Sequence, residues 1–234
     1  MDVTARVLAE RRVGQDSFLI DEIDGRADQK GTGLWTVKTA LDLGVPVPTI
    51  SEAVMFRQLS VTIEQAADSH STHAAMSMRL NDNLAKLQDA VLLALISTFA
   101  QGMSVLTAGK EVMGHELDLG TVLKTWRRGS ILQGALIDLL AKAFRNLGKG
   151  HDVLQSAALQ GVIRKGIKPL RRLTAGAISA GIPCSGLVSS LAYVESKRGS
   201  HLPTSLTQLQ RHYFGKHPIY EKRTGEPINV FWER

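Results

Sequence analysis

The sequence predicts an all-α fold: one large helical domain with a long central helix, followed by an extended C-terminal tail. Apolar residues recur at three- and four-residue steps over 83–112, which is the spacing of one face of a helix. Almost no segment alternates apolar and polar residues with the period of two that a half-buried strand requires. The sequence also has no Gly-x-Gly-x-x-Gly motif after a strand pattern and no Walker A motif, so a nucleotide-binding α/β fold is not predicted.

The predicted central helix covers 83–112 and would be a rod of about 45 Å at 1.5 Å per residue. No proline interrupts it, and Gly114 follows as a stop signal. Polar residues break the apolar run 90–106, which we therefore interpret as too short and too polar for a membrane span. The predicted buried stripe consists of Leu84, Leu87, Val91, Leu95, Phe99, Met103 and Leu106.

The remaining elements are also helical. Thr49 and Glu52 have the spacing of a capping box, which predicts a helix starting at Thr49 and running to 68. Further helices are predicted at 119–127, 131–147, 152–165, 169–180, 185–198 and 203–210, with Pro203 in a first turn. Residues 227–232 are predicted to form a short strand or an extended tail. We divide the chain into a helical domain, 1–200, and a C-terminal helix and tail, 201–234.

Composition excludes several classes of protein. The 234 residues are 44% apolar and carry a net charge of +6, which is not the composition of a disordered chain. The single cysteine, Cys184, excludes an internal disulfide framework and fits a reducing compartment; we interpret it as a small buried apolar residue. The first residues lack the apolar core of a signal peptide. We therefore expect a soluble, cytoplasmic protein.

The basic residues are concentrated between 122 and 172, where only Asp138 and Asp152 are acidic. Such a stretch is either a nucleic-acid footprint or the solvated faces of helices. Interleaved aromatic residues and nucleic-acid-binding motifs are lacking, so we favour solvated faces and expect no nucleic-acid partner. His70 and His73 have a spacing that places two imidazoles on one helix face, but no third ligand is evident, so no metal site is predicted.

One candidate site for an anion or a polyol is the segment 29–33. Two glycines permit close approach of a ligand to the backbone, Lys30 supplies a positive charge and Thr32 a hydroxyl. A helix beginning near Trp35 would add free amides and the positive end of its dipole. An ordinary glycine turn accounts for the pattern equally well.

Two further features have the same chemistry. Arg57 lies on the helix predicted from Thr49, and it is either an oxyanion ligand or a surface residue. The segment 211–217 combines Arg211, two histidines, two aromatic residues and a glycine just after the helix at 203–210. That mixture is more typical of a site or an interface than of a plain surface loop.

These segments together resemble the 6-phosphogluconate dehydrogenase family. The match runs from about residue 16 to residue 232 and consists of separate motifs in the same order. They are Gln-Lys-Gly-Thr-Gly-Leu-Trp-Thr at 29–36, Ala-Leu-Asp-Leu-Gly-Val-Pro-Val at 40–47, Glu-Ala-Val with Arg57 and Leu-Ser at 52–60, Ala-Gln-Gly at 100–102, Trp-Arg-Arg-Gly-Ser-Ile-Leu at 126–132, Ala-Gly-Ile-Pro at 180–183, Leu-Pro at 202–203, and 208–217, which is similar to the family's Gln-Ala-Gln-Arg-Asp-Tyr-Phe-Gly-Ala-His.

The resemblance implies the C-terminal all-helical domain of that family. In the family, a Rossmann domain that holds most of the NADP site precedes this domain, and a catalytic Lys and Glu lie upstream of the position of Gln29. We find no counterpart of either in this sequence, residues 1–12 included. We therefore expect no catalytic residues, no bound cofactor and no dehydrogenase activity from this chain alone, with NADP used by the complete enzyme. A separate N-terminal Rossmann-domain chain is one partner we consider.

The resemblance also assigns roles to residues. Lys30, Thr32 and Arg57 correspond to contacts with the phosphate of 6-phosphogluconate. Arg211 and His217 correspond to a pair that the C-terminal tail contributes across a homodimer interface to the partner's site. The family oxidises C3 of the sugar acid by hydride transfer to NADP, and loss of carbon dioxide gives ribulose 5-phosphate in the pentose phosphate pathway.

The sequence departs from the family pattern around these positions. Leu34 replaces a commonly basic residue, which removes a charge next to the phosphate segment. Ser51 replaces a glycine, and Ser130 stands where a cysteine is usual. A non-enzymatic sugar-phosphate-binding or scaffolding homodimer with the same fold is the alternative function that the sequence leaves open.

Overall fold

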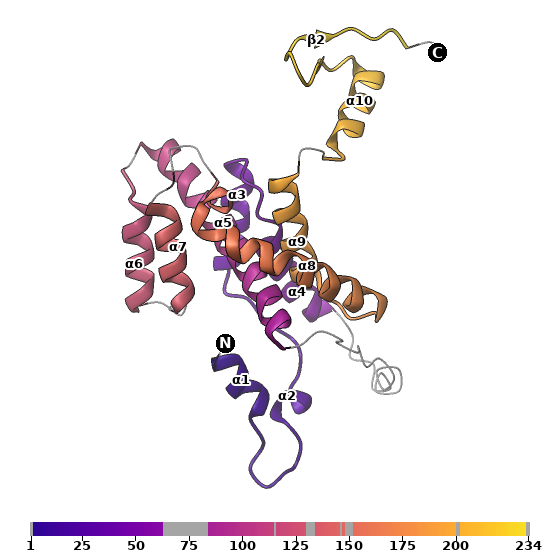
Figure 1. The fold of residues 1–234 in the computed structure, drawn as a ribbon. Coiled ribbons are helices and arrows are strands. Elements are labelled where there is room, and N and C mark those ends of the chain that lie inside the picture. Colours follow the sequence, from indigo (N-terminus) through magenta and orange to yellow (C-terminus); the bar gives the residue numbers. More distant parts are fainter. Residues whose placement is uncertain are drawn as a thin grey trace.

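The computed structural model describes residues 2–62, 84–114, 116–129, 134–145, 147, 152–199 and 202–232. Helices dominate these ranges (Figure 1), which confirms the predicted all-α class. The predicted pair His70 and His73, and Ser130, lie outside the described residues. The elements are α1 (Asp2–Ala9), α2 (Leu19–Glu22), α3 (Thr32–Asp42), α4 (Pro48–Thr62), α5 (Leu84–Met113), α6 (Leu119–Gly129), α7 (Ala135–Arg145), a 3-10 turn (Val153–Gln155), α8 (Ala157–Ser179), α9 (Ser185–Arg198), α10 (Thr204–Gly215), β1 (Ile219–Tyr220) and β2 (Pro227–Ile228).

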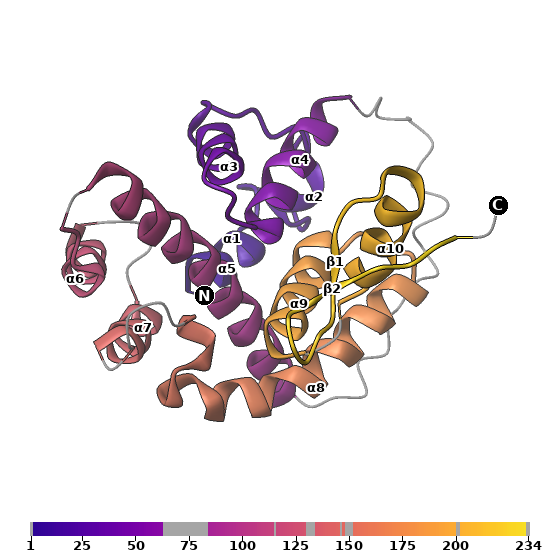
Figure 2. The same ribbon diagram turned by 90° about the horizontal axis from the view of Figure 1, so that it is seen from above.

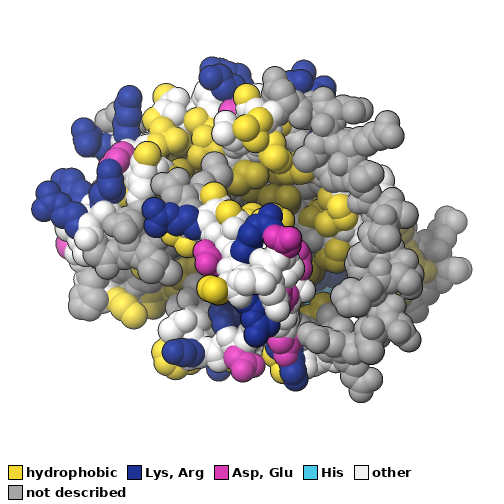
Figure 3. All heavy atoms as spheres, turned by 90° about the horizontal axis from the view of Figure 1, so that it is seen from below, with side chains coloured by type: hydrophobic (Ala, Val, Ile, Leu, Met, Phe, Trp, Pro, Cys, Tyr) yellow, Lys and Arg dark blue, Asp and Glu magenta, His cyan; other side chains and the backbone are white. Residues whose placement is uncertain are grey.

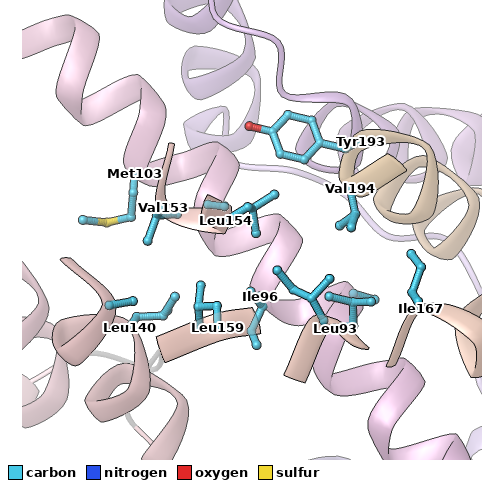
Figure 4. Packing of buried hydrophobic residues seen from close by; sticks show 14 of the residues in the cluster. Leu93, Ile96, Met103, Leu140, Val153, Leu154, Leu159, Ile167, Tyr193 and Val194 are labelled. Atoms are coloured by element: carbon cyan, nitrogen blue, oxygen red, sulfur yellow. The ribbon is translucent and has the colours of Figure 1, made fainter. Parts of the chain in front are cut away.

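Helix α5 is the central element, as predicted, and ends at Gly114, whose φ of 64° lies in the left-handed region. Its buried side chains pack against α7, α8 and α9 (Figure 4). Leu93, Ile96 and Met103 point toward the layer that contains Leu140 of α7 and Leu159 of α8. The core therefore forms around α5, and the flanking helices are positioned relative to it.

The predicted stripe on α5 is only partly right. Met103 is buried, but Leu84 and Leu95 are exposed, and the buried set includes small and polar residues instead. Helices pack on more than one side of α5, so burial is not confined to a single apolar face. The buried residues of α5 are Ala90, Leu93, Ala94, Ile96, Ser97, Ala100, Gln101 and Met103.

Helix α8 corrects the prediction of two helices separated near Pro169. The helix runs without a break through Pro169, which is buried inside it. A proline in a helix interior removes one backbone hydrogen bond and costs about 3 kcal/mol. Packing along α5 compensates, because Gly166 of α8 lies so close to α5 that an added Cβ would stand 2.7 Å from the carbonyl oxygen of Asp89.

The start of α4 is also corrected. The helix begins at Pro48, so Thr49 is inside it and does not act as the predicted N-cap. Proline is favoured at a first helical position because it has no amide to satisfy there. The amide of Thr49, which lacks an intrahelical partner so near the helix start, donates instead to Gln101 Oε1 of α5 at 2.9 Å.

The C-terminal tail forms a small unit of its own. Strands β1 and β2 pair antiparallel, with Ile219 opposite Ile228, and the helix α10 contacts β1. The structure therefore selects the short-strand alternative for 227–228. Figure 1 shows α10 and the hairpin projecting from the helical body, and the segment with α1 and α2 extending from it at the other end. Figure 2 shows the same tail unit from above.

Basic side chains are unevenly distributed over the surface. Lys and Arg side chains gather on the left of Figure 3, the side on which Figure 1 places α6 and α7, and apolar side chains are exposed nearby.

Among the described helices, α5 is long and apolar enough to cross a membrane by length and composition, which corrects the sequence-based expectation that its apolar run is too short and too polar. Half of its most apolar stretch is buried in the protein, so the core accounts for its composition.

Candidate functional site

The first group of candidate residues lies at the start of α3. Gly31 precedes the helix with a φ of 92°, a left-handed conformation that favours glycine. The first helical hydrogen bond runs from the Trp35 amide to the Gly31 carbonyl at 2.9 Å, so the amides before Trp35 have no intrahelical acceptor. Lys30 and Thr32 are exposed beside these amides. Helix α3 begins at Thr32 rather than near Trp35, which places the helix N-terminus directly at the candidate residues.

The second glycine of this segment has a packing role. A Cβ on Gly33 would lie 2.9 Å from Cγ2 of Val54, which is buried on α4. The glycine therefore permits α3 to cross α4 closely, whereas the sequence suggested approach by a ligand. The close crossing fixes the start of α3 against the middle of α4.

Arg57 lies three residues after Val54 on α4 and holds the segment that leads to Lys30. Its guanidinium donates from Nε to the Ala27 carbonyl at 3.2 Å and from Nη2 to the Asp28 carbonyl. Ser60 Oγ accepts the Ala27 amide at 3.0 Å and donates to the Arg57 carbonyl at 2.7 Å. Lys30, Thr32 and Arg57 are thus brought to one corner formed by α3 and α4.

A buried polar cluster holds α4 in place behind this corner. Besides accepting the Thr49 amide, Gln101 donates from Nε2 to Thr49 Oγ1 at 2.9 Å and to Ser97 Oγ at 3.3 Å. Thr49 Oγ1 also contacts Ser190 Oγ of α9 at 3.1 Å. Sequence reasoning identified the Ala-Gln-Gly motif but missed this role. A glutamine inside the most apolar helix was the signal that a buried polar partner existed.

The second group of candidate residues lies on the tail. Arg211, on α10, places Nη2 3.4 Å from Nδ1 of His217, which follows the helix. Both side chains are exposed. Figure 1 places α10 apart from α3 and α4, so one chain does not bring Arg211 and His217 to the corner that holds Lys30, Thr32 and Arg57.

Two kinds of site can be tested against the described part of the chain: a Rossmann-type dinucleotide cradle and a cluster of metal-ligating side chains. Its sheet consists of the antiparallel pair β1 and β2, so the parallel strand and glycine turn that cradle a dinucleotide pyrophosphate are not present in these ranges. Nor do three metal-ligating side chains gather anywhere in the described ranges. The cationic groups, hydroxyl and free helix amides are chemistry for an anion such as phosphate.

Comparisons with known proteins point to a single family. A family model described as the C-terminal domain of 6-phosphogluconate dehydrogenase matches residues 1–232. The decarboxylating 6-phosphogluconate dehydrogenase of Lactococcus lactis subsp. lactis (strain IL1403) is 29% identical over 226 residues, covering 95% of this chain and 48% of its own length. The NADP(+)-dependent, decarboxylating 6-phosphogluconate dehydrogenase of Bacillus subtilis (strain 168) is 31% identical over 233 residues, covering 97% and 50%.

A solved structure gives the same result. The Plasmodium falciparum 6-phosphogluconate dehydrogenase, studied in its apo form and in complex with NADP+ and with 6-phosphogluconate, matches with a TM-score of 0.87 and 29% identity. The match covers 99% of this chain and 51% of that one. The chain spans about half the length of the curated relatives that it matches. By the family model and these relatives, the chain belongs to the 6-phosphogluconate dehydrogenase family and corresponds to its C-terminal domain.

Proposed function

We propose that this chain is the substrate-phosphate-binding and dimerisation part of a 6-phosphogluconate dehydrogenase. The observation that carries the proposal is the corner of α3 and α4, where Lys30 and Thr32 flank free amides at a helix N-terminus and Arg57 fixes the preceding segment. Every one of these groups can donate a hydrogen bond, and two are positively charged. A phosphate monoester is the end of 6-phosphogluconate that suits such a set.

The second part of the proposal is that Arg211 and His217 complete the site of a second copy of the chain. Within one chain they lie on a unit that projects away from α3 and α4. Phe214 and Phe231 on this unit are 81% and 96% exposed, which suits a segment that packs against a partner. A homodimer that exchanges tails would bring five substrate contacts together in each site.

A separate NADP-binding Rossmann half is a further partner in this proposal. The chain spans about half the length of the relatives that it matches, and the strands in its described part are one antiparallel pair instead of the parallel strands of a dinucleotide-binding fold.

In this proposal, the chain contributes binding and orientation to the reaction. Holding the phosphate at a fixed point converts binding free energy into orientation of the distant reacting carbon. The oxidation of 6-phosphogluconate and its decarboxylation depend on residues supplied by the other half. We therefore expect no turnover when this chain alone is mixed with NADP and 6-phosphogluconate, and turnover by the purified chain would contradict this division of labour.

Thermal shift with 6-phosphogluconate tests the phosphate site. Ligand at about 100 times its dissociation constant stabilises a folded protein by about 2.7 kcal/mol. We expect stabilisation of wild type and of the control Lys38→Ala, an exposed lysine on the same helix α3, and its loss in Lys30→Ala and Arg211→Ala. Absence of any shift in wild type would favour the scaffolding homodimer, and a monomer in sedimentation velocity would refute the shared site.

A further inference from the structure

Neighbouring side chains hold Arg211 and His217 in place by hydrogen bonds, and Gln208 is the first of these neighbours. Gln208 lies one helical turn before Arg211 on α10, and its Oε1 accepts from Arg211 Nη1 at 3.0 Å. Its Nε2 donates to the Pro218 carbonyl at 2.8 Å, just beyond His217. One side chain therefore ties the guanidinium of Arg211 to the backbone that follows His217.

His212 holds the backbone of His217 itself. Its Nδ1 lies 2.8 Å from the His217 carbonyl oxygen, and because a carbonyl only accepts, Nδ1 carries the proton. The ring is 8% exposed and packs near Trp232, with ring centroids 6.0 Å apart. Trp232 also makes an edge contact with Tyr213 at 5.4 Å, so the end of the tail folds over α10 and shields the hydrogen bond of His212.

Gly215 leaves room for the His217 ring. A Cβ at this position would lie 3.2 Å from Cδ2 and 3.4 Å from Nε2 of His217. The next residue, Lys216, has a φ of 50°, the left-handed conformation that ends α10 and turns the chain back toward Arg211. The turn and the glycine together place the imidazole of His217 beside the helix end.

The polar groups that this contact leaves over on the two side chains are all donors. A guanidinium has no acceptor, so in the contact at 3.4 Å His217 Nδ1 accepts from Arg211 and the ring proton resides on Nε2. Two N–H groups of Arg211 are used by Gln208 and His217. The remaining guanidinium N–H groups and Nε2–H of His217 are available to an anion.

We infer that Gln208, His212 and Gly215 are positioning residues that hold Arg211 and His217 as a preformed anion clamp before any partner or ligand arrives. The identity of the anion, the phosphate of 6-phosphogluconate, rests on the proposed function. When a long side chain becomes ordered only on binding, the affinity for the ligand falls several-fold to about tenfold. A clamp that is ordered beforehand avoids this loss of affinity. The contacts that hold the clamp all lie within the tail, between Gln208 and Trp232.

The first experiment measures order without ligand. In the full chain, ¹⁵N heteronuclear NOE values are recorded for the Nε–Hε group of Arg211 and the amide of His217. We expect rigid values in wild type and in Gln210→Leu, a matched glutamine on the same exposed helix. We expect mobile values in Gln208→Leu, His212→Leu and Gly215→Ala, and recovery in His212→Asn, which keeps a side-chain N–H donor. Equal values in wild type and all variants would overturn the inference.

The second experiment measures 6-phosphogluconate affinity by titration calorimetry. We expect Gln208→Leu and His212→Leu to weaken binding about five- to tenfold and Gln210→Leu to leave it unchanged. In an Arg211→Ala background, Gln208→Leu should cause a smaller further loss than in wild type, because its contact with Arg211 is already gone and only its bond to the Pro218 carbonyl remains to be removed. A full further loss there would overturn its positioning role. Rigid wild-type side chains with no binding of 6-phosphogluconate would refute the proposed function but leave the positioning inference standing.

Discussion

Two glycines on α8 should respond in opposite directions to the same substitution. A Cβ at Gly166 would lie 2.7 Å from the Asp89 carbonyl oxygen and 2.8 Å from Leu93 Cβ. At Gly161, on the same helix, a Cβ would meet nothing within 4 Å. Both glycines are helical, so alanine gains up to about 1 kcal/mol of helix propensity at either position. The difference between the two variants therefore isolates the packing of α8 on α5.

The expected magnitudes follow from these contacts. Overpacking costs about 1–3 kcal/mol, and at Gly166 the obstructing atoms are backbone oxygen and Cβ, which cannot rotate away. We expect Gly166→Ala to lower the free energy of unfolding by about 2 kcal/mol and Gly161→Ala to raise it by about 0.5–1 kcal/mol. For a domain of this size the melting temperature changes by about 2–4 °C per kcal/mol.

The assay is thermal and urea unfolding of both variants and wild type, followed by circular dichroism at 222 nm. A fall of about 4–8 °C for Gly166→Ala with a small rise for Gly161→Ala would support the close crossing. Equal stabilisation of both variants would show that α8 does not approach α5 at Gly166. That result would also remove the explanation for an uninterrupted helix at Pro169, since that explanation depends on the same contact.

Other predictions concern single polar groups. Gln101→Leu leaves the buried Thr49 amide without its acceptor and should lower the free energy of unfolding by about 2–4 kcal/mol. The control Gln58→Leu, on the exposed face of α4, should change the free energy of unfolding measured in urea by less than about 0.5 kcal/mol. Burial raises the pKa of Tyr193 above 10.0. In alkaline solution the unfolded state therefore loses this proton before the folded state does, and stability falls as pH rises above 10. Tyr193→Phe should flatten the alkaline decline in melting temperature. Hydrogen bonds from Thr121 and Gly120 lower the pKa of Asp118 below 3.8. The ionised carboxylate therefore stabilises the folded state at neutral pH, and this stabilisation is lost in acid. The melting temperatures of wild type and Asp118→Ala should converge as pH falls below about 3.

The sequence sufficed for the class of the fold and for several helix bounds, such as those of α9, because both depend on local properties. The helix predicted at 185–198 matches α9, and Gly114 ends the central helix as predicted. The failures occurred where a distant contact outweighs a local preference. Pro169 is a helix breaker on its own, and only the approach of α5 to Gly166 explains why α8 continues.

The candidate site shows the same difference between local properties, which the sequence indicates, and contacts between distant residues, which it does not. The residue types at Lys30, Thr32 and Arg57 indicated an anion, but their convergence on one corner depends on the contact between Gly33 and Val54, which are 21 positions apart. The roles of Gln208 and His212 could not be predicted, because each is defined by a hydrogen bond across the turn after α10. Donor and acceptor assignments of that kind require the geometry of the turn.

Net charge was a poor guide to the site for a related reason. The basic stretch 122–172 covers α6, α7 and α8, and some of its residues are neutralised locally: Arg127 pairs with Asp138 at 3.1 Å, and Arg171 pairs with Glu195. Arg211 instead has a neutral glutamine and a neutral imidazole nitrogen as its contacts. These contacts fix the orientation of its guanidinium, and its positive charge is not neutralised by a carboxylate. A cation held by neutral groups keeps its attraction for a phosphate, whereas a cation paired with a carboxylate must first exchange that partner. Recognition of an anion therefore depends on how a cation is held, which a count of basic residues does not record.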